Sequence, residues 1–324
     1  MTGIIIPRTL RCDPRLFQKD LSGRVYIVTG ANSGTGLATS AQLLRQGAHV
    51  VGACRRVPAG EAAFANLARL PGSAEIRMLD LASLDSVRRF AEDFLARHER
   101  LDALVNNAGL VTAEGRSEDG YEIQFATNHL GHFLLSELLL DILKASAPAR
   151  IVCLSSVVHA GRGSQPVRID FDDLHFERKP YSAMAAYAQS KLANVLHARE
   201  LARRLEGADV MACSVHPGWV RSNFGAEIMP GWLRGAMNLA LRPFSGFLGI
   251  MSPDDGAQTT LHCLLDDDVP HHNGAYFSQN SILYPNREDR PGGWPMRSPN
   301  PQAHDPEIAS RLYDVSLELV RLKA

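Results

Sequence analysis

Two residues four positions apart in the chain are suited to proton chemistry. Tyr187 and Lys191 occur in the segment YAQSKLAN, and residues at i and i+4 share one face of an α-helix. A phenol has a reference pKa near ~10, and a cation about 5 Å away at an effective dielectric of ~20 contributes roughly 3 kcal/mol, or some two pKa units. The spacing therefore predicts a Tyr187 that is acidic enough to give a proton to a carbonyl oxygen. Taken alone, the pair is also what chance places on many helix surfaces, so its meaning depends on the motifs around it.

Short apolar runs of strand length alternate with longer helical patterns from Arg24 onward. The predicted strands are 25–30, 49–54, 75–80, 103–109, 150–156 and 209–215, and the predicted helices are 36–46, 60–70, 83–98, 119–146 and 183–206. Near-continuous apolar runs are typical of parallel strands that are covered by helices on both faces. We therefore expect an α/β fold, a single-domain, doubly wound (Rossmann) parallel sheet of about seven strands, which binds ligands at the carboxyl ends of its strands.

The ends of the chain differ in texture from this alternating region. We expect an N-terminal extension at 1–20, the sheet domain at 21–283, and a Pro-rich tail with a C-terminal helix at 284–324. A helix from about Ser252 and a strand at 275–278 complete the sheet. Residues 223–251 are apolar but interrupted by Gly and Pro, which indicates a mobile lid over a bulky hydrophobic substrate. A packed helix pair or a dimer face is the alternative for that segment.

Composition excludes several partners. The net charge is −1 and basic residues are spread along the chain, so nothing favours nucleic acid or an anionic membrane. The five cysteines show no spacing typical of zinc or disulfides and read as core thiols. His129, His132, His159 and His216 have no acidic cluster near them, and we expect no metal ion. With no apolar run of ~18 residues, we expect no transmembrane segment and a cytoplasmic protein.

A glycine-rich loop follows the first predicted strand and opens the first helix. Its sequence is TGANSGTG, with Gly30, Gly34 and Gly36 around Ser33 and Thr35. Glycines in this context let the backbone approach a pyrophosphate, whose charge is stabilised by the helix N-terminus. The loop therefore predicts a dinucleotide cofactor.

The end of the second predicted strand indicates which dinucleotide is bound. It reads Cys54, Arg55, Arg56, at a point where folds that prefer NAD carry an acidic residue. An arginine there can hold a 2′-phosphate by charge-assisted hydrogen bonds worth roughly 1.5–3 kcal/mol. We therefore predict NADP(H), with Arg55 as the main contact and Arg56 as its helper; solvated surface arginines are the alternative.

The motifs together resemble a known family. With TGANSGTG, NNAG at 106–109, a serine after the fifth strand, YxxxK and HPG at 216–218, the chain resembles the short-chain dehydrogenase/reductases over about 22–280. It is most similar to their retinol dehydrogenase-like branch through ACRR, TNHLGHFLL, SKLAN and HPGWVRS. A second likeness, through DLASLDSVRRF and NHLGHFLL, is to the light-dependent protochlorophyllide reductases, although YxxxK lacks their acidic residue here.

The resemblance implies a role for each matching residue. Ser156, with Ser155 as a weaker choice, would bind the substrate oxygen, and Tyr187 would give or take the proton. Lys191 would hold the nicotinamide ribose, and Asn128, at a bend in its helix, would order a water beside it. The remaining cofactor contacts implied are Asp80, Leu81, Asn107, Ala108, Gly109, Pro217, Gly218, Val220 and Ser222. Asn106 is expected to brace strands.

These expectations define an NADP(H)-dependent oxidoreductase that acts on a carbonyl or alcohol of a bulky hydrophobic substrate, in a possible homo-oligomer. Tyr181 is a rival phenol, but Ala185 follows it at i+4 where a lysine would be needed. Two alternatives remain at this point. One is an enzyme like the light-dependent reductases, and the other is an NADP(H)-binding sensor without turnover.

Overall fold

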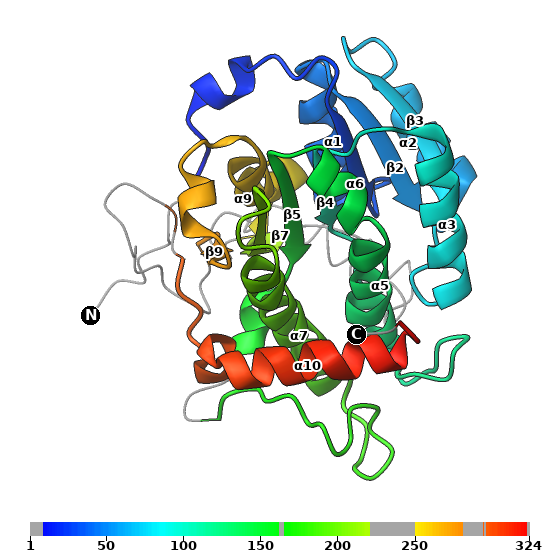
Figure 1. Cartoon of the computed structure of the whole chain (residues 1–324), viewed down its shortest axis with the longest axis vertical. Helices are drawn as coiled ribbons and strands as arrows, with labels where there is room; N and C mark the ends of the chain where they lie inside the picture. The colour runs from blue at the N-terminus through cyan, green and yellow to red at the C-terminus, as the bar shows by residue number, and fades with distance from the viewer. Residues whose placement is uncertain (1–8, 162–164, 221–249, 281–293, 295, 323–324) are drawn as a thin grey trace.

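A parallel sheet forms the centre of the molecule (Figure 1). The computed structural model describes residues 9–161, 165–220, 250–280, 294 and 296–322. The strand order is β3-β2-β1-β4-β5-β6-β9, and every neighbouring pair is parallel. The strands are β1 (Val25–Thr29), β2 (His49–Cys54), β3 (Ser73–Met78), β4 (Ala103–Asn106), β5 (Ala149–Leu154), β6 (Val210–His216) and β9 (Tyr276–Ser278). The predicted doubly wound α/β fold is confirmed.

Helices cover both faces of this sheet. One face packs against α3 (Leu84–Arg97), α5 (Gly131–Leu138), α7 (Ala183–Arg204) and α10 (Pro306–Leu319), and the other against α1 (Gly34–Arg45), α2 (Val57–Ala65) and α9 (Pro253–Leu265). Successive strand residues point to opposite faces, so Ile27 joins the first core and Val28 the second. Burial of each such side chain contributes about 1.5–3 kcal/mol, which explains why the central strands β1 and β4 are mainly apolar, whereas β3 at the sheet edge is more exposed and carries Glu75 and Arg77.

The helix predicted at 119–146 is wrong in its continuity. The structure contains α4 (Ile123–Phe125), a π-helix η2 (Ala126–Leu130), α5 and α6 (Leu140–Ala145). In the π-turn the N–H of Gly131 bonds the carbonyl of Ala126, five residues back. An apolar pattern cannot reveal such an extra residue per turn, because the buried face continues through it. The turn contains Asn128.

The helix predicted at 60–70 is also displaced. It runs from Val57 to Ala65, since Pro58 fits the first turn of a helix, where its missing N–H is not needed.

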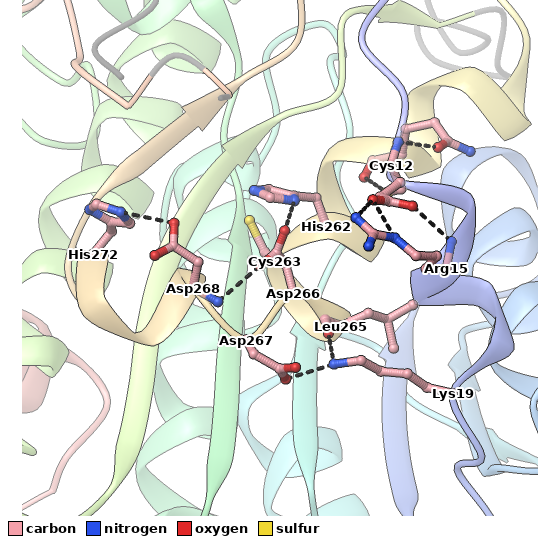
Figure 2. A network of polar contacts seen from close by, with 12 residues as sticks. Cys12, Arg15, Lys19, His262, Cys263, Leu265, Asp266, Asp267, Asp268 and His272 are labelled. Atoms are coloured by element: carbon pink, nitrogen blue, oxygen red, sulfur yellow. Dashed lines mark hydrogen bonds and ion pairs between the residues drawn. The ribbon is translucent and has the colours of Figure 1, made fainter. Parts of the chain in front are cut away.

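The N-terminal segment lies along α9. A 3₁₀-helix, η1 (Pro14–Gln18), leads to Lys19, whose Nζ contacts the Leu265 carbonyl at 2.6 Å and Asp267 at 2.6 Å (Figure 2). Cys12 is held nearby, its N–H donating to Gln258 at 2.9 Å. These contacts attach the segment to the middle and to the C-terminal end of α9.

Helix α10 crosses α7 and α5 in the lower half of Figure 1. Tyr313 packs edge-on against Phe133 of α5 with ring centres 4.9 Å apart, and Ser316 Oγ lies 2.9 Å from His129 Nε2. The face formed by α5 and α7 is therefore covered by the chain's own C-terminal helix.

Some predicted segments fall outside the described residues. Residues 223–249 of the predicted lid do so, while Ile250 and Met251 form β8 and pair with β7 (Trp219–Val220). The predicted division into extension, domain and tail stays a prediction. All five cysteines are free and buried, as predicted. Within the described residues, each helix is either too short or too polar to traverse a lipid bilayer.

Candidate active site

Four loops meet at the carboxyl ends of the central strands. Four strands lie side by side in the sheet in the order β1, β4, β5 and β6, and all run in the same direction. The loops that follow them carry the glycine triplet, NNAG, the serine pair and HPG. Parallel strands gather such loops at one edge, so motifs far apart in the sequence form one site.

The first loop has room only for glycine at two positions. Gly30 adopts φ +65°, and a Cβ there would lie 3.1 Å from the backbone of Ala108. A Cβ on Gly36 would lie 2.6 Å from the Gly30 carbonyl oxygen and 2.5 Å from Asn107 Nδ2. Helix α1 begins at Gly34, preceded by an extended Ser33. The loop thus brings bare backbone to a helix N-terminus, the arrangement that binds a dinucleotide pyrophosphate.

Asn107 joins the first loop to the second. Its Nδ2 donates to the Thr29 carbonyl at 2.8 Å, and its Oδ1 accepts from the Thr35 hydroxyl at 2.8 Å. The backbone N–H groups of Asn107 and Ala108 both donate to Thr29 Oγ1 at 2.9 Å. The Asn107 side chain is therefore engaged in shaping the glycine loop.

Helix α7 carries Tyr187 and Lys191 on one buried face. The Ser182 hydroxyl caps its N-terminus. Tyr187 is 6% exposed and Lys191 is 1% exposed. Ser156 hydrogen-bonds the Tyr187 phenol. Lys191 Nζ lies 5.7 Å from the Tyr187 ring centre and donates to the Leu154 carbonyl at 2.9 Å.

The two serines after β5 have different surroundings. Ser155 is buried and donates to the Lys191 carbonyl at 2.7 Å, which fixes α7 to the end of the strand. Ser156 is half-buried and is the serine that contacts Tyr187. The geometry therefore favours Ser156 over Ser155 as the residue beside the phenol, as the sequence indicated.

Asn128 links the π-turn to α7. Its side chain exchanges hydrogen bonds with the backbone of Leu110, at 2.8 and 3.0 Å, and donates to Ser190 Oγ at 3.0 Å. Ser190 in turn donates to the carbonyl of Tyr187 at 2.8 Å. The structure thus brings together all four predicted catalytic residues, since Asn128 braces the turn of α7 that holds Tyr187 and Lys191.

Burial decides the ionisation of the central pair. It raises the pKa of Tyr187 well above the ordinary value, although the hydrogen bond from Ser156 lowers it in part. Burial lowers the pKa of Lys191 to about 7. The expectation that Lys191 depresses the Tyr187 pKa is wrong for this geometry. It assumed a partly solvated cation, whereas both groups lie in a low-dielectric interior that disfavours each charged form.

Thr29 and His132 are site residues that the sequence reasoning did not identify. His132 Nδ1 lies 3.1 Å from the carbonyl of Asn128, which can only accept, so Nδ1 carries the proton and Nε2 accepts from the Thr29 hydroxyl at 2.9 Å. Burial lowers the pKa of His132 to about 3, so the imidazole is neutral. The available signal was its place one helical turn after Asn128.

The HPG loop meets the glycine loop at the N-terminus of α9. Gly218 has φ +88° and packs against Met251. A Cβ on Gly256 would lie 2.3 Å from Val220 and 2.9 Å from Thr35, so both side chains rest on that glycine. Pro217 is half-buried in the same turn. The predicted contact Ser222 lies outside the described residues.

The remaining predicted contacts lie beside the first loop. Asp80 Oδ1 accepts from the N–H of Ala82 at 3.0 Å, and Leu81 is buried under α5. Arg55 and Arg56 are exposed after β2. The N–H of Gly30 donates to Ala53 in that strand at 2.8 Å, which places the two arginines next to the glycine loop.

The other candidates from the sequence have structural roles. The rival phenol Tyr181 donates to Glu122 at 3.0 Å and accepts from Gln124 at 2.8 Å, so it attaches the segment before α7 to α4. Asn106 is buried, and its amide donates to the Ser136 hydroxyl at 2.9 Å. Its backbone pairs with Cys153 in the β4–β5 ladder, as expected of a residue that braces strands, and its side chain in addition braces β4 against α5.

Known proteins share this arrangement. The short chain dehydrogenase family matches residues 24–167. Retinol dehydrogenase 13 of Homo sapiens is 40% identical over 309 residues, which cover 94% of this chain and 86% of the relative. The chain belongs to the short-chain dehydrogenase family. It lies in the retinol dehydrogenase-like branch, as the motifs indicated, and this short-chain dehydrogenase is therefore an oxidoreductase that uses a nicotinamide cofactor.

Solved structures agree with this assignment. A crystal structure of an uncharacterized protein from Mycobacterium Paratuberculosis matches with a TM-score of 0.71 and 33% identity, covering 94% of this chain and 96% of the other. The RhlG/NADP active-site complex of Pseudomonas aeruginosa matches with a TM-score of 0.63 and 25% identity, covering 82% and 97%. The glycine cradle described above fits such a cofactor, because bare backbone lies where side chains would block it.

Proposed function

We propose that this short-chain dehydrogenase interconverts a carbonyl and an alcohol on a bulky apolar substrate, with NADP(H) as cofactor and Tyr187 as acid and base. The contact between Ser156 and Tyr187 at the end of β5 carries the proposal. Two hydroxyls from different elements converge there, so both can donate to one substrate oxygen. The cofactor supplies the hydride chemistry, and the chain supplies alignment and a preorganised polar site.

The ionisation of the pair supports a proton donor. Because burial raises the pKa of Tyr187, its phenol is protonated at neutral pH, as a proton donor must be, whereas the hydrogen bond from Ser156 acts in the direction that makes it a stronger acid. Lys191, held to the Leu154 carbonyl at 2.9 Å, lies where it can hold the ribose hydroxyls of the nicotinamide. Asn128 fixes the adjoining turn of α7 and would order a water beside Lys191.

Arg55 and Arg56 support NADP(H) over NAD(H). They follow β2 directly, beside the glycine loop, and no acidic residue stands at that strand end to repel a 2′-phosphate. A solved relative of known cofactor, the RhlG complex, contains NADP. One charge-assisted bond to the phosphate contributes roughly 1.5–3 kcal/mol, enough to set the preference.

Two observations support an apolar substrate. Several relatives about 40% identical to this chain are named for retinol, which is a long apolar alcohol. Residues 223–251 of this chain are rich in Met, Leu, Phe and Trp and are proposed to cover the substrate. A lipophilic aldehyde, ketone or alcohol therefore fits better than a sugar phosphate.

The test compares two tyrosines. Tyr187→Phe removes only the proposed acid, and we expect turnover of a carbonyl panel to fall on the order of 10²–10⁴-fold while NADPH binding stays nearly unchanged. Tyr181→Phe is the matched control, since it deletes a phenol bound to Glu122 instead. Absorbance loss of NADPH is followed in darkness. Full activity in Tyr187→Phe would refute the assignment.

The dark assay also separates the alternatives. Dark turnover excludes an obligatory photoreaction of the protochlorophyllide reductase type, which the missing acidic residue in YxxxK already disfavours. A non-catalytic sensor would bind NADPH without oxidising it across a broad panel. Membership of an enzyme family and retention of both Tyr187 and Lys191 favour catalysis.

A further inference from the structure

A cluster of two histidines and one carboxylate lies at the opposite end of the sheet from Tyr187. His49 begins β2, Glu75 lies in β3, and His98 ends α3. These three elements lie together on the right of Figure 1. His49 pairs in register with Ser73, two residues before Glu75, so the side chains of His49 and Glu75 point to the same face, the one covered by α3.

The three side chains present their donor atoms to one small volume. His98 Nε2 lies 2.8 Å and His49 Nε2 lies 4.0 Å from Glu75 Oε1, and the three ligand atoms all lie within 4.8 Å of one another. Ligands at ~2.0–2.1 Å from a tetrahedral ion are about 3.3 Å apart. The observed distances of 2.8 and 4.0 Å lie on either side of that value. Small changes of side-chain rotamer can therefore bring the three donor atoms to the separations that one ion requires.

His49 is already in the form that binds a metal. Its Nδ1 contacts Ser73 Oγ at 2.8 Å, while its Nε2 is buried and has no hydrogen-bond partner within the described part of the chain. A metal-binding histidine characteristically has its other nitrogen fixed in this way by a second group.

Glu75 has one oxygen for this cluster and one for another partner. Arg77 holds Oε2 at 2.5 Å through Nη2 and 3.0 Å through Nε, which leaves Oε1 facing the histidines. A carboxylate oriented by a second hydrogen-bonding group is common around metal ions, although the Arg77 charge weakens the attraction.

We propose that His49 Nε2, His98 Nε2 and Glu75 Oε1 bind one Zn²⁺ ion, with solvent as the fourth ligand. Two imidazoles and one carboxylate suit Zn²⁺. The side chains are 16–27% exposed, so the site is open to the solvent ligand. The ion would join β2, β3 and α3 far from the cofactor loops, so its role is to stabilise the sheet edge. The proposal departs from the expectation of no metal, which considered other histidines.

The experiment measures zinc stoichiometry and affinity. Tag-free protein is stripped with a chelator and titrated with ZnCl₂ by calorimetry, and bound metal is counted after gel filtration. We expect one saturable Zn²⁺ per chain and a thermal midpoint that rises with zinc. Glu75→Gln and His98→Ala should weaken binding at least tenfold, whereas His271→Ala, which removes an exposed histidine elsewhere, should not.

Two controls keep the result decisive. Circular dichroism and NADPH titration of each variant show whether it is folded, and Co²⁺ in place of Zn²⁺ gives visible bands that report tetrahedral coordination. Unsaturable binding, or equal affinity in the wild-type, Glu75→Gln and His98→Ala proteins, would mean an adventitious ion only and would overturn the proposal.

Discussion

Gly109 lies directly against Lys191. A Cβ on Gly109 would come within 3.1 Å of Lys191 Nζ and 3.3 Å of Asn128 Oδ1. Both contacts are tighter than ordinary packing, and Lys191 Nζ is fixed on its other side by the Leu154 carbonyl. The loop after β4 therefore sets the position of the ammonium group.

Replacing Gly109 with alanine is predicted to impair turnover more than folding. Displacing Lys191 by a few tenths of an ångström disturbs alignment at the reacting centre, and we expect kcat to fall on the order of tenfold to hundredfold. Gly115→Ala is the control, because its Cβ would meet Ile123 at an ordinary 3.5 Å. Steady-state kinetics and thermal melting of both variants check this. A large loss of thermal stability without a specific loss of kcat would contradict it.

Cofactor preference is predicted to depend on Arg55. Arg55→Gln removes one charge-assisted bond to a 2′-phosphate, so the NADPH dissociation constant should rise about ten- to hundredfold while that for NADH changes little. Arg45→Gln is the control, because it makes the same charge change at an exposed site in the last turn of α1. Fluorescence titration with both nucleotides gives the ratio. Equal weakening toward NADPH in the two variants would show a general charge effect.

The junction of the first two loops is predicted to be fragile. Asn107→Leu leaves the Thr29 carbonyl and the Thr35 hydroxyl without their partner, and leaving a polar group of the buried Thr29 unsatisfied costs about 1–3 kcal/mol. We expect a lower free energy of unfolding in urea and weaker NADPH binding together. Asn66→Leu, at the exposed end of α2, should change neither. Normal NADPH affinity in Asn107→Leu would refute the role in shaping the loop.

Acid is predicted to destabilise the protein through buried histidines. Burial lowers the pKa to about 3 for His129, His132 and His216 and to about 4 for His159, and lowers it well below the ordinary value for His197. Between about pH 6.5 and these values the unfolded chain binds more protons. Stability is therefore complete above pH 6.5 and falls as the pH drops through that window, by roughly 1 kcal/mol per histidine for each pH unit.

One substitution isolates a single histidine of this group. His197 packs against Phe133, and its Nε2 is buried with no hydrogen-bond partner among the residues described. In His197→Leu one titrating group is gone, so the free energy of unfolding should fall less steeply with acid between pH 6 and 4. The exposed His271→Leu should keep the wild-type slope. Identical slopes in all three proteins would show that burial of His197 does not drive the effect.

Local sequence patterns were enough to predict where the strands of the sheet lie. β2 lies where it was predicted, at His49–Cys54, and β1, β3 and β5 begin or end within two residues of their predicted bounds. Strands that are buried on both faces are mainly apolar, and glycine and polar residues mark their ends. The local sequence is therefore enough to locate such strands. The prediction of one continuous helix at 119–146 was wrong because a π-turn leaves the apolar pattern intact.

In the candidate site, too, local features were predictable from the sequence and features that depend on packing were not. The spacing of Tyr187 and Lys191 placed them on one helical face, because helix geometry is local. Their ionisation was not predictable, since burial of both groups depends on how α7 packs against β5. Thr29 and His132 were missed for a related reason, as their hydrogen bond joins residues 103 positions apart.

By itself, the sequence determined the doubly wound sheet and the glycine loop, because both follow from local periodicity and from the common direction of parallel strands, and its resemblance to the short-chain dehydrogenases implied the grouping of Asn128, Ser156, Tyr187 and Lys191. Only the tertiary structure decided the direction of the pKa shifts of Tyr187 and Lys191 and the meeting of His49, Glu75 and His98. Those properties depend on desolvation and on distances of a few ångströms between elements, which are set only when the helices pack onto the sheet.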